Sequence, residues 1–334
     1  MKVFADSHHD ALFHSLRLLF EGRLGYELYR PIGLNWYEKG FWKYSDNPNV
    51  IKQYLEPRDI DKDMGDFWNC PESRHCQVDK AVTLEQFKKM KFDIIIPSVV
   101  NNEEPFYKLR NEHMPKAKII RQMGNVHDTV HTDLCPNIMA SMLLEEIPGD
   151  CNIIQYHQEF DLKTFKYLPP AGQMRISNFM NCFPDCRDFP LWDEFKKELP
   201  DFDWKMYGIL GENGIIGGID NVAKEISNST FIWHVKPGGD GYGHVVHNAF
   251  ACGRPLIIRR KYYADKLGGL LLEHGKTCID IDAAPRNEII DLIKFFAIPE
   301  NHAKMCKDVR QRFDDVVNFD EQAKYIKEFL KELI

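Results

Sequence analysis

Two hydrophobic periods alternate along this chain, and together they predict strands that alternate with helices. Short apolar runs without a polar interruption, such as residues 94–96 and 256–258, predict strands that are buried on both faces of a parallel sheet. Apolar residues three and four positions apart, as at Leu12, Leu16 and Leu19, predict amphipathic helices. The repeated strand–helix units therefore predict an α/β fold with doubly wound sheets.

The predicted elements fall into two successive sets. In the first set, strands are expected at residues 2–6, 27–30, 92–98, 117–120, 138–141 and 152–154, with helices after the first strand and at 83–89 and 106–113. In the second set, strands are expected at residues 175–180, 204–210, 231–235, 256–258 and 278–281, with helices at 191–199, 222–226, 245–250, 287–296 and 320–334. The paired prolines and glycine at 168–172 predict a linker. The chain is therefore expected to form two Rossmann-like domains, residues 1–168 and 173–319.

Residues 33–80 fit neither period. They mix aromatic and charged residues with little regularity. A substrate-facing insertion or lid is one interpretation, and ordinary irregular structure packed by its aromatic rings is the other.

Composition favours a globular protein of the cytoplasm. The chain has 334 residues, and its content of 44% hydrophobic and 28% charged residues is typical of globular domains. No apolar run approaches the roughly 20 residues that cross a bilayer, and Asp6 comes too early for a signal peptide. Nine irregularly spaced cysteines indicate a reducing compartment. The net charge of −7 argues against a protein that holds nucleic acid by its overall field.

Residues 231–258 contain the clearest functional pattern. A buried strand is followed by a glycine-dense loop at 236–243, a short helix and another strand. Glycines let the backbone approach an anion closely, and the first N–H groups of a helix point at it. Lys236 adds a cation at the loop entrance. This arrangement predicts a phosphate site, although a glycine-rich turn alone is also common in α/β proteins that bind no phosphate.

The end of this stretch is more specific. Residues 248–255 have the sequence Asn-Ala-Phe-Ala-Cys-Gly-Arg-Pro, and Asp240 precedes Asn248 by seven intervening residues. This pattern resembles the second domain of retaining glycosyltransferases of the GT-B fold, in which an acidic residue, a second acidic residue after the same interval and an Ala-Cys-Gly-x-Pro ending follow a glycine loop. The chain departs from the family at Asn248, where an amide replaces the second carboxylate. An amide can still donate to and accept from a ribose hydroxyl.

The resemblance implies a complete architecture and a donor site. The two domains would face each other across a cleft, and the helix at 320–334 would pack back on the first domain. The donor diphosphate of a nucleotide sugar would be held by Lys236, Gly238, Gly239, Gly241, Tyr242, Gly243 and His244, with Asn248 at the ribose. Asp240 would contact the transferred sugar. No metal and no other cofactor is expected, because Lys236 and the loop backbone would stabilise the diphosphate.

Other candidate residues lie in loops that follow predicted strands. Ligands of open α/β sheets bind outside the carboxyl ends of the strands. His9 and Asp10 follow the first strand, so His9 is a candidate base toward an acceptor hydroxyl, or a hydrogen-bond partner of the sugar; a helix cap and a solvated histidine are the alternative. Arg187 follows the first strand of the second domain and is a weaker candidate for the diphosphate.

Two further patterns argue against metal sites. His127 and His131 have the i, i+4 spacing of a helical metal site, but Thr129 and Val130 between them are poor helix formers, so a lining loop or plain surface is favoured. The cysteines at 182 and 186 lack the paired Cys-x-x-Cys spacing of zinc sites.

These observations predict a glycosyltransferase that moves a sugar from a nucleotide-sugar donor to an acceptor. A sugar, a lipid-linked glycan, a protein and a modified nucleic-acid base all remain open as acceptors. Two alternatives also remain open. A sugar-nucleotide epimerase has the same fold and needs no acceptor, and a non-catalytic nucleotide-sugar-binding protein needs only the donor site.

Overall fold

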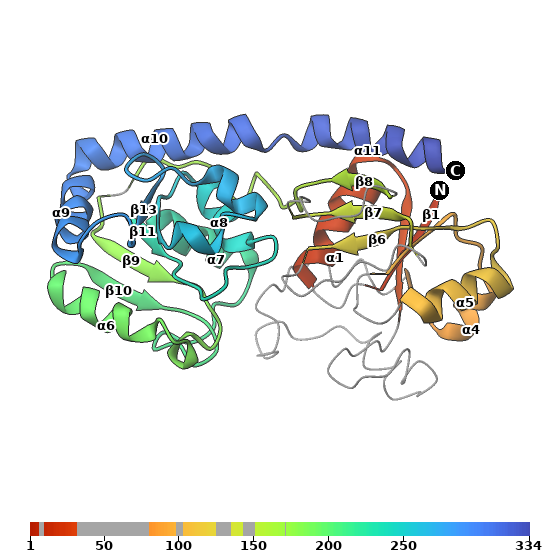
Figure 1. Ribbon diagram of the computed structural model, residues 1–334, viewed down its shortest axis with the longest axis horizontal. Helices are drawn as coiled ribbons and strands as arrows, with labels where there is room; N and C mark the ends of the chain where they lie inside the picture. Colours follow the sequence, from red (N-terminus) through yellow and green to blue (C-terminus); the bar gives the residue numbers. More distant parts are fainter. Residues whose placement is uncertain (7–9, 32–79, 98–102, 125–134, 143–150, 171) are drawn as a thin grey trace. The chain divides into compact units, whose positions relative to one another are not determined.

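A computed structural model of the chain describes residues 1–6, 10–31, 80–97, 103–124, 135–142, 151–170 and 172–334 (Figure 1). These residues form two compact units. Unit 1 combines Met1–Phe160 with Phe319–Ile334, and unit 2 is Asp161–Asn318. Residues 161–168, which the sequence analysis assigned to the first domain, thus belong to unit 2. Most of the aromatic-rich stretch at 33–80 lies outside the described residues, as do His9, His127 and His131.

Unit 1 contains two parallel sheets. The strands of the first are β1 (Lys2–Ala5), β2 (Glu27–Pro31), β3 (Ala81–Val82), β4 (Ile94–Ile96) and β5 (Lys118–Ile119), in the order β3-β2-β1-β4-β5. The second consists of β6 (Arg121–Met123), β7 (Asn137–Ala140) and β8 (Asn152–Gln155), in that order. Every strand pairing is parallel. The strand predicted at 117–120 is therefore only half of an extended segment, because the chain leaves the first sheet at Ile120 and enters the second one residue later.

Helices cover both faces of the first sheet. Alternate residues of β1 point to opposite faces, as strand geometry requires. Val3 and Ala5 pack in an apolar cluster with α1 (Asp10–Arg17) and the π-helical segment η1 (Leu18–Arg23), and Phe4 packs in another with α4 (Leu84–Lys89) and α5 (Glu103–His113). The α4 helix begins with a reciprocal capping box between Thr83 and Gln86, the kind of N-terminus expected from the threonine.

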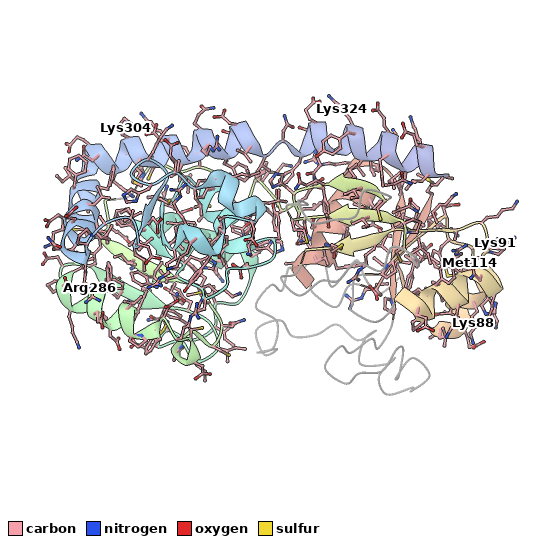
Figure 2. All side chains as sticks on the ribbon, in the orientation of Figure 1. Lys88, Lys91, Met114, Arg286, Lys304 and Lys324 are labelled. Carbon is pink, nitrogen blue, oxygen red and sulfur yellow. The ribbon has the colours of Figure 1, made fainter. Side chains whose placement is uncertain are left out.

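Helix α11 (Phe319–Leu333) returns to unit 1 after the whole of unit 2. Its buried residues Ala323, Ile326 and Leu330 belong to the same apolar cluster as Val3. On the opposite side, Lys324 projects into solvent (Figure 2). The apolar residues lie three and four positions apart, which is why the sequence pattern identified this helix.

Unit 2 is built on one five-stranded parallel sheet. Its strands are β9 (Arg175–Asn178), β10 (Asp203–Met206), β11 (Phe231–Trp233), β12 (Leu256–Ile258) and β13 (Cys278–Asp280), in the order β10-β9-β11-β12-β13. The helices are α6 (Phe189–Glu198), α7 (Ile219–Asn228), α8 (His244–Ala251), α9 (Arg286–Ala297) and α10 (Pro299–Val316). From β9 the chain runs outward to β10 and then crosses to β11 on the other side. The strand order therefore reverses between β9 and β11.

Tryptophan rings fill the core of unit 2 between α6 and the sheet. Trp192 of α6 packs edge-on against Trp204 of β10, with ring centroids 4.7 Å apart, and against Trp233 of β11 at 5.7 Å. All three side chains are buried. Edge-to-face contacts of this kind stabilise a core beyond the area that they bury. These contacts fix the position of α6 along β10 and β11.

Two predictions about unit 2 need correction. The strand predicted at 204–210 ends at Met206, because the chain bends at Gly208, with φ of 116°, and turns again at Leu210, with φ of 66°. The helix α10 was not predicted at all. Its buried apolar residues Met305, Val309 and Phe313 lie four positions apart, a helical spacing on which no prediction was based.

Candidate functional site

The candidate site lies at the carboxyl edge of the unit 2 sheet, where β9 and β11 are neighbours. In open α/β sheets, ligands bind outside the carboxyl ends of the strands at the point where the strand order reverses. Here the reversal brings together the loop after β9, which carries Arg187, and the loop after β11, which carries Lys236. Burial raises the pKa of the Cys186 thiol, and the nearby positive charge of Lys236 partly opposes this increase. The two loops therefore lie close together.

The glycine loop packs tightly against the segment after β12. Gly239 has a φ of 70°, and a Cβ atom at this position would lie 2.3 Å from the carbonyl oxygen of Tyr262. Only glycine fits this close approach without displacing the backbone. Gly243 is the N-cap of α8 and supplies no capping side chain. The N-terminal turn of α8 is therefore not capped by a residue of its own loop.

Asp240 is the centre of a charged cluster in this loop. Its Oδ2 atom lies 2.7 Å from Nε2 of His234 and accepts a hydrogen bond from the hydroxyl of Tyr263 at 3.0 Å. Its Oδ1 atom accepts from the ammonium of Lys236. The side chains of His234 and Tyr263 are buried, whereas 19% of the Asp240 side chain and 42% of the Lys236 side chain are exposed. The buried pair thus holds a carboxylate–ammonium pair at the surface of the loop.

The electrostatics of the cluster favour an ionised carboxylate. Burial by itself would raise the pKa of Asp240, but the charge and hydrogen bonds of His234 and Lys236 outweigh it and hold this pKa well below its usual range. Burial, and then the neighbouring Asp240, raise the pKa of Tyr263 well above its usual value. Asp240 is therefore a fixed negative charge and a hydrogen-bond acceptor at neutral pH, and Tyr263 is a neutral donor.

Aromatic stacking fixes the second half of the loop on α8. The ring of Tyr242 stacks on His247 with centroids 4.0 Å apart and an interplanar angle of 15°. The same ring meets His244 edge-on at 5.1 Å. Nδ1 of His247 lies 2.9 Å from the carbonyl oxygen of Gly243, so it donates to the last residue of the loop. Tyr242 is buried, which indicates that its aromatic ring orders the loop beneath the site.

Asn248 is buried in α8, one helical turn after His244. Only 1% of it is exposed, and its Oδ1 atom has no hydrogen-bond partner among the described residues. A buried polar atom without a partner is costly, and in native proteins such atoms often mark functional positions. Asn248 is the residue at which the sequence departs from the glycosyltransferase pattern.

Arg187 joins a second cluster beside the first. Its guanidinium donates to the hydroxyl of Tyr262 at 2.9 Å, and that hydroxyl donates to Oδ2 of Asp188 at 2.9 Å. The guanidinium of Arg259 also lies over the Tyr262 ring, 5.8 Å from its centroid. Because Tyr262 precedes Tyr263, the basic cluster and the Asp240 cluster occupy adjacent positions on the same short segment. Within the part of the chain that the structure describes, Arg187 forms no hydrogen bond with Lys236 or Asp240.

The Cys-Gly-Arg-Pro ending of the motif has a structural role. A Cβ atom on Gly253, whose φ is 68°, would lie 2.4 Å from the ring of Tyr167. The guanidinium of Arg254 is fully buried and donates to carbonyl oxygens of Ser227 and Leu168, and also to those of Cys252 and Gly253. These bonds tie the segment before β9 to the ends of α7 and α8. The ending therefore stabilises the packing of α7, α8 and the segment before β9, and it does not contact the charged cluster.

Two candidate residues, His9 and Asp10, belong to unit 1. His9 lies outside the described residues, and Asp10 is the first residue of α1 but its side chain is not described. Cys182 and Cys186 are free thiols. Within the described ranges, no group of three or more histidine, cysteine or acidic side chains is arranged to hold a metal ion.

His234 and Tyr263, which contact Asp240 directly, were not predicted from the sequence. His234 falls within the strand predicted at 231–235, but β11 ends at Trp233 and the imidazole turns toward the loop. A histidine at the end of an otherwise apolar run was the available signal. Tyr263 had none, because only the folding of η5 (Arg260–Tyr262) brings it 3.0 Å from Asp240.

Comparisons with known proteins identify the fold. No family model and no curated protein sequence matches this chain. Solved structures do. A glycosyltransferase from Rickettsia africae ESF-5 matches with a TM-score of 0.66 and 11% identity, over 99% of this chain and 98% of the other. HepE of Anabaena in complex with UDP matches with a TM-score of 0.63 and 11% identity, over 99% of both chains.

An α-glucosyltransferase in complex with UDP-glucose and DNA containing an abasic site is also similar, with a TM-score of 0.64 and 10% identity, over 99% of this chain and 98% of the other. These matches extend over both units. The chain therefore has the GT-B fold of two Rossmann-like domains, and the fold expected from residues 240–255 is confirmed. Across the described helices, none combines the length and the apolar character needed to span a bilayer.

Proposed function

We propose that this protein is a glycosyltransferase that uses a nucleotide sugar, and that residues 234–248 with Tyr263 form its donor site. The observation that carries the proposal is the position of Asp240, fixed by a buried histidine and a buried tyrosine beside the N-terminus of α8. A carboxylate in this place can accept hydrogen bonds from sugar hydroxyls. The nearby amides and Lys236 can receive the phosphates.

In this proposal Lys236 changes partners when the donor binds. In the free protein its ammonium pairs with Asp240, and 42% of its side chain is exposed. A diphosphate at the N-terminal turn of α8 offers more negative charge than one carboxylate, so Lys236 can turn to it and release one oxygen of Asp240 for the sugar. Negative charge that develops on the leaving diphosphate is then stabilised by Lys236 and the loop amides, including those of Gly238, Gly241 and Gly243.

Arg187 extends the positive potential of this edge. The guanidinium is exposed and donates one hydrogen bond among the described residues, to Tyr262, so it is available to a second phosphate oxygen. Asn248 provides the amide for the nucleoside ribose, which would satisfy its unpartnered Oδ1 atom. Uridine diphosphate sugars are the first donors to test, because HepE of Anabaena has been solved with UDP-glucose.

His9 and Asp10 remain the proposed groups on the acceptor side, with His9 as the base toward the acceptor hydroxyl. Metal-independent transfer is part of the proposal, since Lys236 and the backbone amides supply positive charge at the phosphates. Activity that persists in a chelator supports this part, and loss that is restored by a divalent ion contradicts it. The seven cysteines of the described ranges are free thiols, which supports a reducing compartment such as the cytoplasm.

The test is donor binding by isothermal titration with UDP and UDP-glucose. Asp240→Asn and Lys236→Met are expected to weaken binding. A matched control exists in the same unit, because Lys304 and Asp308 of α10 form another i, i+4 ion pair on an exposed face (Figure 2). Asp308→Asn and Lys304→Met are expected to bind like the wild type. Equal binding by all four variants contradicts the proposed site.

The products formed from UDP-glucose distinguish a transferase from the two alternative functions. Incubation with UDP-glucose alone yields slow hydrolysis to UDP and glucose for a transferase that lacks its acceptor. An epimerase converts the free nucleotide sugar to its isomer without releasing UDP. A non-catalytic binding protein does neither, even when Asp240-dependent binding is intact.

A further inference from the structure

Two consecutive tyrosines lie at the carboxyl edge of the unit 2 sheet, and each contacts a different charged residue of the candidate site. Tyr262 is the last residue of η5, and Tyr263 follows it. The Tyr262 hydroxyl accepts a hydrogen bond from Arg187 at 2.9 Å, and the Tyr263 hydroxyl donates to Oδ2 of Asp240 at 3.0 Å. One short segment therefore contacts both the cation after β9 and the carboxylate of the glycine loop.

The backbone of this segment is fixed by close packing. A Cβ atom on Gly239 would lie 2.3 Å from the carbonyl oxygen of Tyr262, and a Cβ atom on Gly269 would lie 2.0 Å from that of Tyr263. Only glycine permits such contacts, so the segment packs closely against both the glycine loop and η6 (Leu267–Leu271). The two tyrosines therefore start from a backbone whose position is well defined.

A buried acid orients the Tyr262 hydroxyl. This hydroxyl donates to Oδ2 of Asp188 at 2.9 Å, and only 10% of the Asp188 side chain is exposed. A carboxylate only accepts hydrogen bonds, so the phenolic proton is directed at Asp188 and a lone pair remains for Arg187. Asp188 is the N-cap residue of α6, whose position the contacts of Trp192 fix. The acceptor that Tyr262 offers to Arg187 is therefore held in place from the core of unit 2.

Three cations surround the Tyr262 ring, but they have different partners. The charged groups of Arg187, Arg259 and Lys261 lie 5.7, 5.8 and 5.9 Å from the ring centroid. Lys261 pairs with Asp282 at 2.8 Å, and Arg259 lies 3.7 Å from the same residue. Among the described residues no carboxylate forms an ion pair with Arg187. Arg187 is therefore the cation of this group that a phosphate can engage without displacing a carboxylate.

We propose that Tyr262 is a positioning residue of the donor site, which holds Arg187 for the donor diphosphate, while Tyr263 holds Asp240 for the sugar. This division rests on the proposed function, because neither role exists unless a nucleotide sugar binds at this edge. An exposed arginine loses conformational entropy when it binds a ligand, and a guanidinium that is already held loses less. Tyr262 therefore raises the affinity for the diphosphate without contacting it.

The test compares UDP with UDP-glucose in two phenylalanine variants of the full chain, by isothermal titration. Tyr262→Phe removes the bond to Arg187 and is expected to weaken both ligands by the same factor, about three- to tenfold, because both carry the diphosphate. Tyr263→Phe removes a bond to Asp240 and is expected to weaken UDP-glucose by a similar factor. UDP is expected to bind Tyr263→Phe within about twofold of the wild type, because it lacks the sugar.

A double-variant cycle determines whether Tyr262 acts through Arg187. Arg187→Gln is expected to weaken UDP at least as much as Tyr262→Phe does. Adding Tyr262→Phe to Arg187→Gln is then expected to change the affinity by less than about twofold, because the group that Tyr262 holds is already absent. A purely structural effect of the tyrosine would persist in that background. Thermal unfolding of each variant verifies that unit 2 stays folded.

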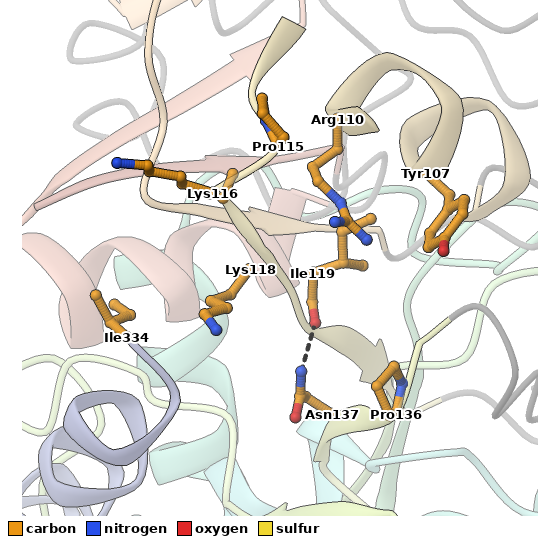
Figure 3. Close-up of a pocket in the computed structure, with 10 residues that line it drawn as sticks. Tyr107, Arg110, Pro115, Lys116, Lys118, Ile119, Pro136, Asn137 and Ile334 are labelled. Carbon is orange, nitrogen blue, oxygen red and sulfur yellow. Dashed lines mark hydrogen bonds between the residues drawn. The ribbon is translucent and has the colours of Figure 1, made fainter. Parts of the chain in front are cut away.

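Unit 1 supplies a matched control. Arg110 of α5 lies over the ring of Tyr107, with 4.8 Å between the guanidinium carbon and the ring centroid, beside a cavity at the start of β5 and β7 (Figure 3). Tyr107→Phe therefore alters another tyrosine–arginine pair, outside the unit that carries the proposed donor site. Both ligands are expected to bind this variant within about twofold of the wild type.

Several outcomes overturn the division of roles when UDP binds to the wild type. Tyr262→Phe can leave the affinity for UDP unchanged, or it can weaken UDP as much in the Arg187→Gln background as in the wild type. Tyr263→Phe can weaken UDP as much as UDP-glucose. Binding that depends on Lys236 but not on Tyr262 overturns the inference and leaves the donor site intact. If neither ligand binds to the wild type, the proposed function is wrong and the role of Tyr262 falls with it.

Discussion

Nε2 of the buried His234 lies 2.7 Å from Oδ2 of Asp240, and this contact fixes the position of the carboxylate on the glycine loop. Because an ionised carboxylate only accepts, the imidazole donates from Nε2. The Nδ1 atom is buried and has no hydrogen-bond partner among the described residues. The contact therefore orients the Asp240 carboxylate through Oδ2 and leaves Oδ1 to pair with Lys236.

The first prediction concerns the charge of Asp240. The change Asp240→Asn keeps the shape of the side chain but removes the acceptor that neutralises Lys236 and holds His234. Affinity for a UDP-sugar is expected to fall by roughly tenfold to hundredfold, the usual loss for hydrogen bonds to charged groups. Titration calorimetry measures it. Affinity within about twofold of the wild type, with the fold intact, rules out a direct role of the carboxylate.

The second prediction separates the crowding at Gly239 from the strain of a left-handed residue. Gly239→Ala places a Cβ atom 2.3 Å from the carbonyl oxygen of Tyr262, which forces the loop away from η5. Gly275 has a similar φ of 74° but no atom within 4 Å of the added Cβ, so Gly275→Ala introduces only the backbone strain. Both variants are expected to lose about 1 kcal/mol or more of stability.

Only Gly239→Ala is expected to weaken donor binding, because the loop amides move with the backbone. Donor affinity and thermal unfolding are measured for both variants. If Gly275→Ala lowers donor affinity as much as Gly239→Ala, general strain rather than loop position explains the effect.

The third prediction concerns the pH dependence of unit 1. Burial raises the pKa of Glu159 to about 7, in spite of the guanidinium of Arg23 at 2.6 Å. The folded state therefore binds a proton more tightly than the unfolded state, in which this pKa is 4.5. The stability that Glu159 contributes is fully present below about pH 4.5 and is lost as the pH rises through 7.

His157 acts in the opposite direction, because burial lowers its pKa to about 4 from 6.5. Its contribution is present above pH 6.5 and is lost as the pH falls toward 4. The wild type is thus expected to change little between about pH 5 and 6.5, while Glu159→Gln, which cannot titrate, becomes more stable by roughly 1 to 2 kcal/mol as the pH rises over this range. Hydrogen exchange of unit 1 peptides measures this. Equal pH slopes in the two proteins contradict the assignment.

The fourth prediction concerns the buried arginine of the Cys-Gly-Arg-Pro ending. Arg254→Met keeps the length of the side chain but leaves the carbonyl oxygens of Leu168 and Ser227 without their donor. A loss of about 3 kcal/mol or more in the stability of unit 2 is expected, since buried acceptors lose their hydrogen bonds. The exposed Arg286, which pairs with Glu194, provides the control Arg286→Met. Donor affinity of the folded fraction is expected to stay within about threefold, because Arg254 lies away from the loop.

The regular elements of this fold were largely predictable, because burial imposes the periods that the sequence carries. The apolar runs at β4, β11 and β12 are buried on both sides, and the residues of α11 that repeat at helical spacing are those that pack in unit 1. The helix α10 was not predicted, although its buried residues Met305, Val309 and Phe313 also lie four positions apart. The pattern also gave no sign that the segment around Ile120 belongs to two sheets.

The candidate site was predictable only where its residues are contiguous. Lys236, Asp240 and the loop glycines are recognisable from one stretch of sequence, and the first two are in contact. Arg187 was a candidate only through the general rule that loops after the strands carry ligands, and no local pattern indicated that Tyr263 reaches the same edge from a separate βα loop. Sequence also could not distinguish the packing role of Gly253 and Arg254 from a chemical one, since the motif presents them in one run with Asn248.

The contribution of α11 to unit 1 sets the order in which the chain can fold during synthesis. Unit 2 has all of its residues once Asn318 has been made, whereas the apolar cluster around Val3 still lacks Ala323, Ile326 and Leu330. During synthesis, unit 1 can therefore complete its core only after unit 2. Until then the exposed apolar face of unit 1 is a surface that a chaperone can hold.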